Sequence, residues 1–319
     1  MIMKKNIFKL FSAMVVSATV LTGCIEEVFP EDSTATSEQI GASATALEAA
    51  VSGMPSQMVQ GYLVYGSQTH ETDLGYPSLM LAQSELLGDV VDTDYGYDWW
   101  WPFNASLQMY DNGYYSYLPY FTLYKFVKSA NDVISVVDVT DPTITDEIRG
   151  LGSISHAFRA FSYYTLMVLF EPVENIYTDC SKVLGLTVPI VTEETTNDIA
   201  KSNPRATHEE MVNFILSDLD KAEIGLESYI PTSKNFPDLA VVYGLKAKVY
   251  MWDGQFDKAA EYARKAIDKS GATPMNEAQW HNPTTGFNTA TSAWMWYLHP
   301  TASNMGNLAN FIGHISNEA

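Results

Sequence analysis

The chain has 319 residues, of which 46% are hydrophobic, enough to bury the core of one large domain or of two modest ones. Its formal charge is −20, and without the three lysines of its first 23 residues 15 basic residues face 38 acidic ones, a charge of −23. Such a charge repels nucleic-acid phosphates and anionic lipid, so it excludes a nucleic-acid-binding protein and one that lies flat on an anionic bilayer.

The N-terminal segment has the pattern of a lipoprotein signal. Three lysines precede an apolar run of 12 residues, Leu10–Leu21, which is too short to span a bilayer because spanning needs about 20. The run ends in the sequence LTGC, a lipobox whose cysteine, Cys24, would receive a diacylglycerol. We therefore expect residues 1–23 to be a signal peptide, Cys24 to be the lipidation site, and residues 24–35 to be an acidic tether.

The residues after the lipobox indicate the destination. Glu26 and Glu27 follow Cys24 closely, and no aspartate stands directly after it. This arrangement resembles the surface-export signal of Bacteroidetes lipoproteins. We therefore expect a lipid-anchored protein of the outer membrane, exposed at the cell surface.

The first predicted helix follows the tether. Thr36-x-x-Gln39 has the spacing of a capping box, which starts a helix. Apolar residues then recur at steps of three and four and predict one helical stripe. These residues are Ile40, Ala44, Leu47, Val51, Met54 and Met58.

The next segment is rich in aromatic residues: thirteen of the thirty residues from Tyr95 to Tyr124. Sugar rings stack their C–H faces on aromatic rings, and carboxylates and amides bind their hydroxyls. Three consecutive tryptophans cannot all point inward, because neighbouring side chains diverge on a helix and alternate on a strand. The predicted ligand-binding residues are Asp94, Tyr97, Asp98, Trp99, Trp100, Trp101 and Asn104. The alternative is that these rings fill gaps between helices.

An acidic cluster precedes the tryptophans. Asp89, Asp92, Asp94 and Asp98 carry the hard oxygen ligands that calcium prefers. Their spacing does not match an EF-hand loop, because Gly96 occupies a ligand position. A solvated acidic loop is the preferred interpretation, and no metal or cofactor is expected.

Three further long helices are predicted. The first spans Tyr114–Asp138, with Pro119 breaking or kinking its start. The second spans Ile144–Phe170, ends before Pro172, and is apolar almost all round from residue 157, which predicts a buried central helix. Tyr114, Tyr117, Phe121 and Tyr124 have the helical spacing of core residues. His156, near Arg159, is interpreted as a hydrogen-bonded core histidine.

The third helix opens at the capping box Thr207-x-x-Glu210 and carries an apolar stripe. Its stripe consists of Met211, Ile215, Leu219, Ala222 and Leu226. Before it, residues 173–206 are predicted to be irregular. They include Cys180, the only cysteine besides Cys24, so no intramolecular disulfide can form in the mature chain once Cys24 carries lipid.

The clearest pattern is a helical hairpin. Leu239–Trp252 and Phe256–Ser270 are predicted helices joined by the turn Asp253-Gly254-Gln255. The residues that match a tetratricopeptide repeat are Tyr243, Ala247, Tyr250, Gly254, Phe256, Ala259 and Ala266. A single repeat cannot bury its own face, so this hairpin is expected to stack on the earlier helices.

The ordered set of motifs resembles the SusD/RagB family of outer-membrane nutrient-binding lipoproteins, from about residue 36 onward. Besides the hairpin, the resemblance rests on residues 148–150, 157–164, 169–170, 187–191, 205–207 and 215–222. Glu171–Glu174 departs from the Gly-Asp/Asn-x-Pro that usually follows the central helix. Members are usually longer, so residues 36–319 are expected to be the N-terminal part of a SusD-like domain.

The resemblance implies an all-α fold of tetratricopeptide-like helix pairs with long irregular loops. It also implies capture of an oligosaccharide, or less often a peptide, for delivery to a SusC-like TonB-dependent transporter, without catalysis. A repeat scaffold without small-molecule cargo stays open, as does a glycoside hydrolase, which needs two carboxylates. None of the common hydrolase, metal or phosphate-loop motifs occurs, and the six histidines show no ligand spacing.

Overall fold

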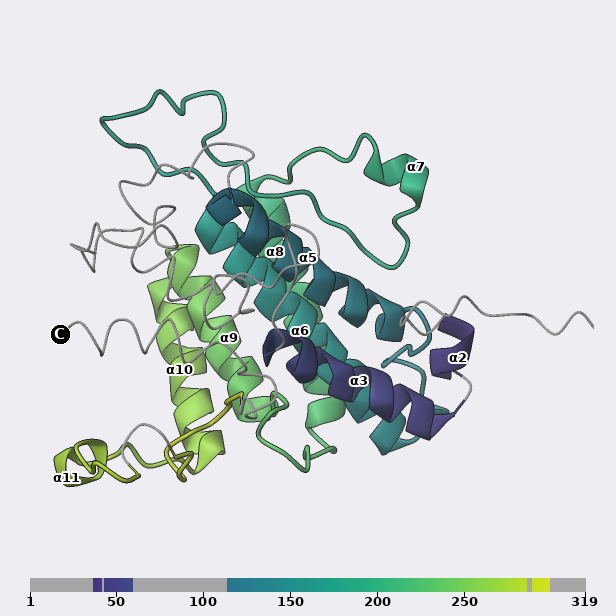
Figure 1. Cartoon of the computed structure of the whole chain (residues 1–319), viewed down its shortest axis with the longest axis vertical. Coiled ribbons are helices and arrows are strands. Elements are labelled where there is room, and N and C mark those ends of the chain that lie inside the picture. Colours follow the sequence, from purple (N-terminus) through teal and green to yellow (C-terminus); the bar gives the residue numbers. More distant parts are fainter. Residues whose placement is uncertain (1–36, 42, 60–113, 286–288, 299–319) are drawn as a thin grey trace, which may run out of the picture. The chain divides into compact units, whose positions relative to one another are not determined.

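The computed structural model describes residues 37–41, 43–59, 114–285 and 289–298 (Figure 1). Within these ranges every regular element is a helix, and one isolated antiparallel bridge joins Leu186 to Thr207. The described part of the chain is therefore all-α, as predicted. The helices are α2 (Ser37–Gly41), α3 (Ala44–Val59), α5 (Tyr114–Ile134), α6 (Asp146–Phe170), α7 (Asn197–Ala200), α8 (His208–Leu226), α9 (Leu239–Trp252), α10 (Phe256–Ser270) and α11 (Glu277–Trp280).

Helix α6 is the centre of the core, and α3, α5 and α8 all pack against it (Figure 1). Thr145 caps its start by accepting a hydrogen bond from the Ile148 backbone N–H at 3.2 Å, and two acidic residues of the first turn suit the helix dipole. The helix ends at Phe170, ahead of Pro172. The predicted buried central helix is confirmed, because nearly every residue from 150 to 167 is buried.

A glycine and a serine let α6 and α8 approach closely. A Cβ added at Gly225 of α8 would lie 2.4 Å from the Ser153 hydroxyl oxygen and 2.6 Å from the Arg149 carbonyl oxygen, both on α6. The Ser153 hydroxyl also accepts a hydrogen bond from the Gly225 backbone N–H at 3.1 Å. The two helices therefore meet along their backbones, with no room for a larger residue at position 225.

A buried ionic network also joins α6 to α8. The Arg159 guanidinium donates to both carboxylate oxygens of Asp218, each at 2.8 Å, and His156 Nδ1 lies 2.8 Å from Asp218 Oδ1. The side chains of Arg159 and Asp218 are each 2% exposed. Arg159 also donates to Asn131 of α5 and to Glu193 of the following loop. The prediction for His156 is thereby confirmed.

The electrostatics of this network favour the charged forms. Burial alone would raise the pKa of Asp218, but the hydrogen bonds from Arg159 and His156 outweigh it and hold that pKa below its usual value. Burial likewise opposes the charge on Arg159, and the contacts with Asp218 and Glu193 outweigh it and raise the pKa of the guanidinium. Both groups therefore stay ionised inside the core.

The predicted hairpin is confirmed with the predicted bounds. Its turn contains Gly254, whose φ of 74° lies in the left-handed region that favours glycine. Helices α9 and α10 pack closely, and the Tyr250 and Tyr262 rings stack at 5.4 Å between centroids. Helix α9 also packs against α8, so the hairpin rests on the earlier helices as expected.

The segment before α8 is irregular, as predicted, apart from the short α7. Its stretch 187–193 is held to the core by side chains from α5 and α6. The Tyr163 hydroxyl donates to the Val191 carbonyl at 2.9 Å, the Asn131 amide donates to the same carbonyl at 3.1 Å, and the Tyr124 hydroxyl donates to the Pro189 carbonyl at 2.5 Å. The stretch is therefore fixed to the core although it forms no helix, and Thr187 and Val188 are themselves buried.

The sequence predictions differ from the structure at three places. The first predicted helix is two helices, α2 and α3, and Ala44 of its stripe is exposed whereas the other five residues are buried. Helix α5 runs through Pro119, which lies in its second turn, and ends at Ile134. Tyr117 is 45% exposed and does not belong to the core.

Candidate binding pocket between α8 and the α9–α10 hairpin

The predicted ligand-binding residues lie outside the described part of the chain. They are Asp94, Tyr97, Asp98, Trp99, Trp100, Trp101 and Asn104, and the calcium alternative at Asp89 and Asp92 falls in the same range. The lipidation site Cys24 and the acidic tether also lie outside it. These assignments stay predictions.

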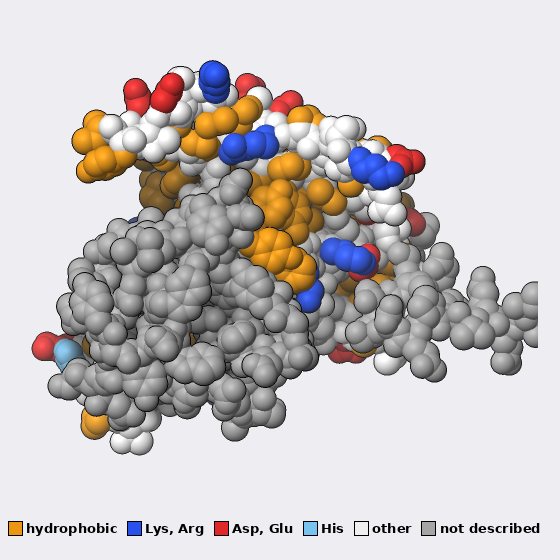
Figure 2. Space-filling view, turned by 45° about the horizontal axis from the view of Figure 1, so that its top comes forward, with side chains coloured by type: hydrophobic (Ala, Val, Ile, Leu, Met, Phe, Trp, Pro, Cys, Tyr) orange, Lys and Arg blue, Asp and Glu red, His pale blue; other side chains and the backbone are white. Residues whose placement is uncertain are grey.

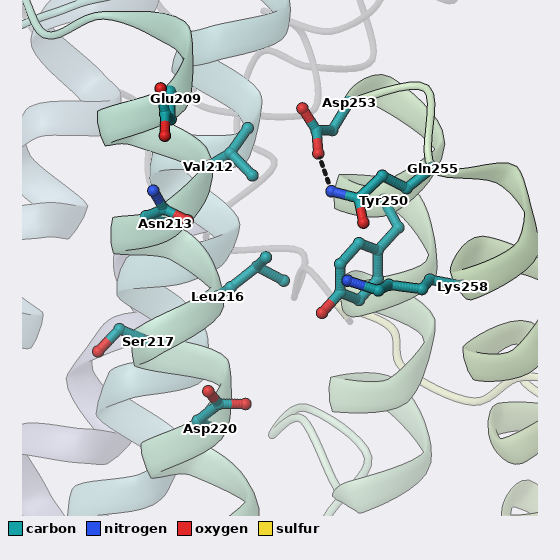
Figure 3. Close-up of a pocket in the computed structure, with 10 residues that line it drawn as sticks. All are labelled: Glu209, Val212, Asn213, Leu216, Ser217, Asp220, Tyr250, Asp253, Gln255 and Lys258. Carbon is teal, nitrogen blue, oxygen red and sulfur yellow. Dashed lines mark hydrogen bonds between the residues drawn. The ribbon is translucent and has the colours of Figure 1, made fainter.

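A pocket lies between α8 and the α9–α10 hairpin (Figure 3). Its volume is about 660 Å³, within the range of about 300–1,000 Å³ that is usual for small-molecule sites. Val212 and Leu216 point from α8 toward the hairpin, which presents the Tyr250 ring to them (Figure 3). The pocket is lined by Glu209, Val212, Asn213, Leu216, Ser217, Asp220, Tyr250, Asp253, Gln255 and Lys258.

Two of the carboxylates that line the pocket already have partners. Lys246 of α9, whose side chain is 2% exposed, places its ammonium 2.6 Å from Asp220 Oδ1. Burial opposes its charge, but hydrogen bonds to Asp220 and Glu223 outweigh the burial and raise the pKa of Lys246. Asp253 accepts from the Gln255 amide, and His208 Nε2 lies 3.1 Å from its Oδ1.

His208 joins three helix ends beside the pocket. Its Nδ1 lies 2.8 Å from Glu171, which follows the last residue of α6, and its Nε2 lies 3.1 Å from Asp253 after α9. The Trp252 indole also donates to Glu171, at 3.1 Å. Glu171, where the sequence departs from the family pattern, therefore serves to tie α6 to α8 and α9.

Neutral polar groups of the pocket have no partner in the described ranges. The side chains of Asn213, Ser217 and Tyr250 make no hydrogen bond there, and the Lys258 ammonium lies over the Tyr250 ring, 5.0 Å from its centroid. Burial raises the pKa of the Tyr250 hydroxyl, so this group is a neutral donor at physiological pH. The pocket therefore offers an aromatic ring, two aliphatic side chains and uncommitted neutral hydrogen-bonding groups.

Sequence reasoning missed this pocket. In the sequence Tyr250 is one of the residues that match a tetratricopeptide repeat, which indicates a packing role rather than a binding site. The polar residues of α8 lie on the face opposite its apolar stripe, as on any surface helix. Nothing in the sequence distinguished them from ordinary solvent-exposed residues.

The described residues contain no candidate metal site and no candidate membrane-spanning helix. Among them, no group of three or more histidine, cysteine, aspartate or glutamate side chains could hold a metal ion. The Cys180 thiol is free and lies in the loop after α6. Among the same residues, none of the helices has the length and apolar character needed to cross a membrane.

Hydrophobic side chains also reach the surface (Figure 2). In the loop after α6, Ile176 is 92% exposed and Tyr177 is 89% exposed, although both are large. Single exposed hydrophobic residues are common on protein surfaces, so this pair alone does not define a binding site.

The sequence model of a SusD-like family, described as starch-binding and associating with the outer membrane, matches residues 80–251. The chain belongs to this SusD-like family. The match covers α5, α6, α8 and nearly all of α9, so it includes the central core and most of the residues around the pocket. No curated protein matches the sequence.

Solved structures share the fold of this SusD-like chain. A SusD-like carbohydrate-binding protein from Bacteroides vulgatus matches with a TM-score of 0.64 and 19% identity, over 83% of this chain and 52% of its own. A SusD superfamily protein from Bacteroides thetaiotaomicron matches with a TM-score of 0.55 and 19% identity, over 82% and 54%.

A SusD-like carbohydrate-binding protein from Bacteroides fragilis also has a TM-score of 0.55, with 13% identity, over 79% of this chain and 46% of its own. The chain thus spans about half the length of these solved structures. At such identities the likeness is one of fold, and it assigns no ligand to this chain.

Proposed function

We propose that this chain is a glycan-binding lipoprotein of the outer membrane that captures oligosaccharides and delivers them to a SusC-like TonB-dependent transporter. The observation that carries the proposal is the family match over residues 80–251, because that family is described as starch-binding and associating with the outer membrane. The lipobox at Cys24 supports it, since a lipid anchor would hold an acidic protein at the membrane while leaving its body free in solution.

The proposed glycan site contains Trp99, Trp100 and Trp101, with Asp94, Tyr97, Asp98 and Asn104 beside them. Flat indole rings give sugar rings an apolar surface, and the carboxylates and amides bind hydroxyls. The proposed role is binding without bond cleavage. A ligand that is a peptide rather than a glycan is the main competing outcome of the experiment below.

A titration tests the site. The full chain, kept in detergent, is titrated calorimetrically with maltohexaose, laminarihexaose, cellohexaose and a mixed peptide pool. Trp99→Ala, Trp100→Ala and Trp101→Ala are compared with Trp280→Ala, a half-exposed tryptophan of α11. Loss of one stacking indole should weaken binding by roughly 10- to 100-fold, which corresponds to about 1.5–3 kcal/mol of lost burial.

The outcomes separate the alternatives. Binding of peptides but of no glycan would replace the glycan by a peptide cargo. Glycan binding that none of the three substitutions weakens would remove these tryptophans from the site. Release of shortened sugars, detected by mass spectrometry, would make the protein an enzyme. Co-purification with a large outer-membrane barrel protein tests the partner, and its absence from native membranes would contradict the delivery step.

A further inference from the structure

The geometry points to a second oligosaccharide site in the pocket between α8 and the α9–α10 hairpin, one that takes neutral sugars. This site consists of other residues than the tryptophan site proposed above. The proposed function does not include this second site. Only the class of ligand, a sugar, rests on the proposed function.

The lining suits a sugar ring better than a purely apolar ligand. Leu216 points at the hairpin, and the Tyr250 ring faces it from the other side (Figure 3). Together they form an apolar surface for the C–H faces of a sugar. The Tyr250 hydroxyl, with Asn213 and Ser217 along α8, supplies neutral donors and acceptors for hydroxyl groups. A volume of about 660 Å³ leaves room for more than one sugar ring.

The charges favour a neutral ligand over a cation. Asp220 Oδ1 is paired with the Lys246 ammonium, and Asp253 is bonded to His208 and Gln255, so the charges of both carboxylates are already partly compensated. The other two charged residues of the lining are Glu209, which is negative, and Lys258, which is positive, so their charges offset each other.

The charges also disfavour an anion. Lys258 is exposed and contacts the pocket through its ammonium on the Tyr250 ring, with Glu209, Asp220 and Asp253 nearby in the same lining. The whole chain carries −20, which repels anions at long range. Because the Lys258 side chain is long and exposed, its ammonium can leave the ring and donate to a sugar hydroxyl instead.

Two tyrosines of the hairpin provide a matched test. Tyr250 lines the pocket, whereas Tyr243 contacts the same Tyr262 ring at 6.1 Å between centroids and does not line it. Tyr250→Phe keeps the ring and removes one hydroxyl, so the affinity for a neutral hexasaccharide should fall about three- to tenfold, the value of one hydrogen bond. Tyr243→Phe should leave the affinity unchanged.

The experiment uses the full chain in detergent and the same three neutral hexasaccharides, with hexagalacturonate and a lysine-rich peptide as charged probes. Hydrogen exchange followed by mass spectrometry reports on peptides that cover residues 209–220 and 250–258. We expect a neutral hexasaccharide to protect both segments, and we expect the protection to persist when Trp99, Trp100 and Trp101 are all replaced by alanine.

The contrary results are distinct. Binding abolished by the tryptophan substitutions, with no protection in either segment, would overturn the second site and leave the proposed function intact. Protection by the peptide or by hexagalacturonate alone would overturn the neutral-sugar assignment. No binding of any glycan to the wild-type chain would overturn both proposals. Equal effects of Tyr250→Phe and Tyr243→Phe would remove the Tyr250 hydroxyl from the site.

Discussion

Replacing Asp218 by asparagine tests whether the ionic network holds α6 to α8. The substitution keeps the shape of the side chain and removes the charge that Arg159 contacts through two hydrogen bonds of 2.8 Å. Arg159, 2% exposed, would keep Glu193 as its ionic partner within the described residues. Breaking a buried pair from one side costs about 3–5 kcal/mol, because the remaining charge loses its buried partner and is only partly compensated by other groups.

The free energy of unfolding should therefore fall by about 3–5 kcal/mol, a large share of the roughly 5–15 kcal/mol that is typical of folded proteins. Urea denaturation followed by circular dichroism at 222 nm measures the change. Asp198→Asn is the matched control, because its ion pair with Lys201 lies on the surface, with side chains 90% and 76% exposed, and should contribute little. Equal losses in both variants would refute the role assigned to the network.

The pH dependence gives an independent check on the same residue. The pKa of Asp218 is lower in the folded protein than in the unfolded chain, so its ionised form stabilises the fold. That contribution is complete above the unfolded-state pKa of about 3.9 and is lost as the pH falls from there through the folded-state pKa. The stability difference between the wild type and Asp218→Asn should therefore shrink below pH 4. A difference that stays constant down to pH 2 would contradict the assignment.

Three further predictions concern the helix contacts. Gly225→Ala should lower the free energy of unfolding by about 1–3 kcal/mol, because the added Cβ meets α6. Gly244→Ala, with open space around its Cβ, should raise the free energy of unfolding by about 0.5–1 kcal/mol. Urea denaturation measures both changes, and changes of the same sign would contradict the close contact at Gly225. His208→Ala should cost about 1–2 kcal/mol at neutral pH, and a double-mutant cycle with Glu171→Gln should show coupling; additive losses would disprove the contact. The pKa of Lys246 is raised in the fold, so its stabilising contribution is complete below the unfolded-state pKa of about 10.4 and is lost as the pH rises through the folded-state pKa. The stability difference between the wild type and Lys246→Met should therefore stay constant from neutral pH to about pH 10 and shrink above it.

The helices were largely predictable because their signals are local. The Thr207 capping box and the stripe from Met211 to Leu226 lie within one element, and all five stripe residues are buried. The hairpin was predicted with its observed bounds because a glycine turn separates two strongly helical segments. The resemblance to the SusD/RagB family is likewise confirmed by the family match.

The partners of buried charges were not predictable, because they depend on distant segments. Arg159 was visible as a charge on a buried helix, but its contacts with Asp218 and Asn131 span 59 and 28 residues of sequence. The pocket was unpredictable for the same reason. Its residues look like ordinary surface positions within each helix, and only the packing of the hairpin against α8 brings them together. The break between α2 and α3 was missed because the apolar period continues across it.

Contacts with Tyr163, Asn131 and Tyr124 fix residues 187–193 to the core. They therefore divide the long connection between α6 and α8 into two separate loops. The first, residues 173–186, contains Ile176 and Tyr177, and the second contains α7. Each loop begins and ends on the core, so either loop could gain or lose residues during evolution without shifting α8. A protease that cuts at Tyr177 would likewise leave two fragments that stay associated through α5, α6 and α8.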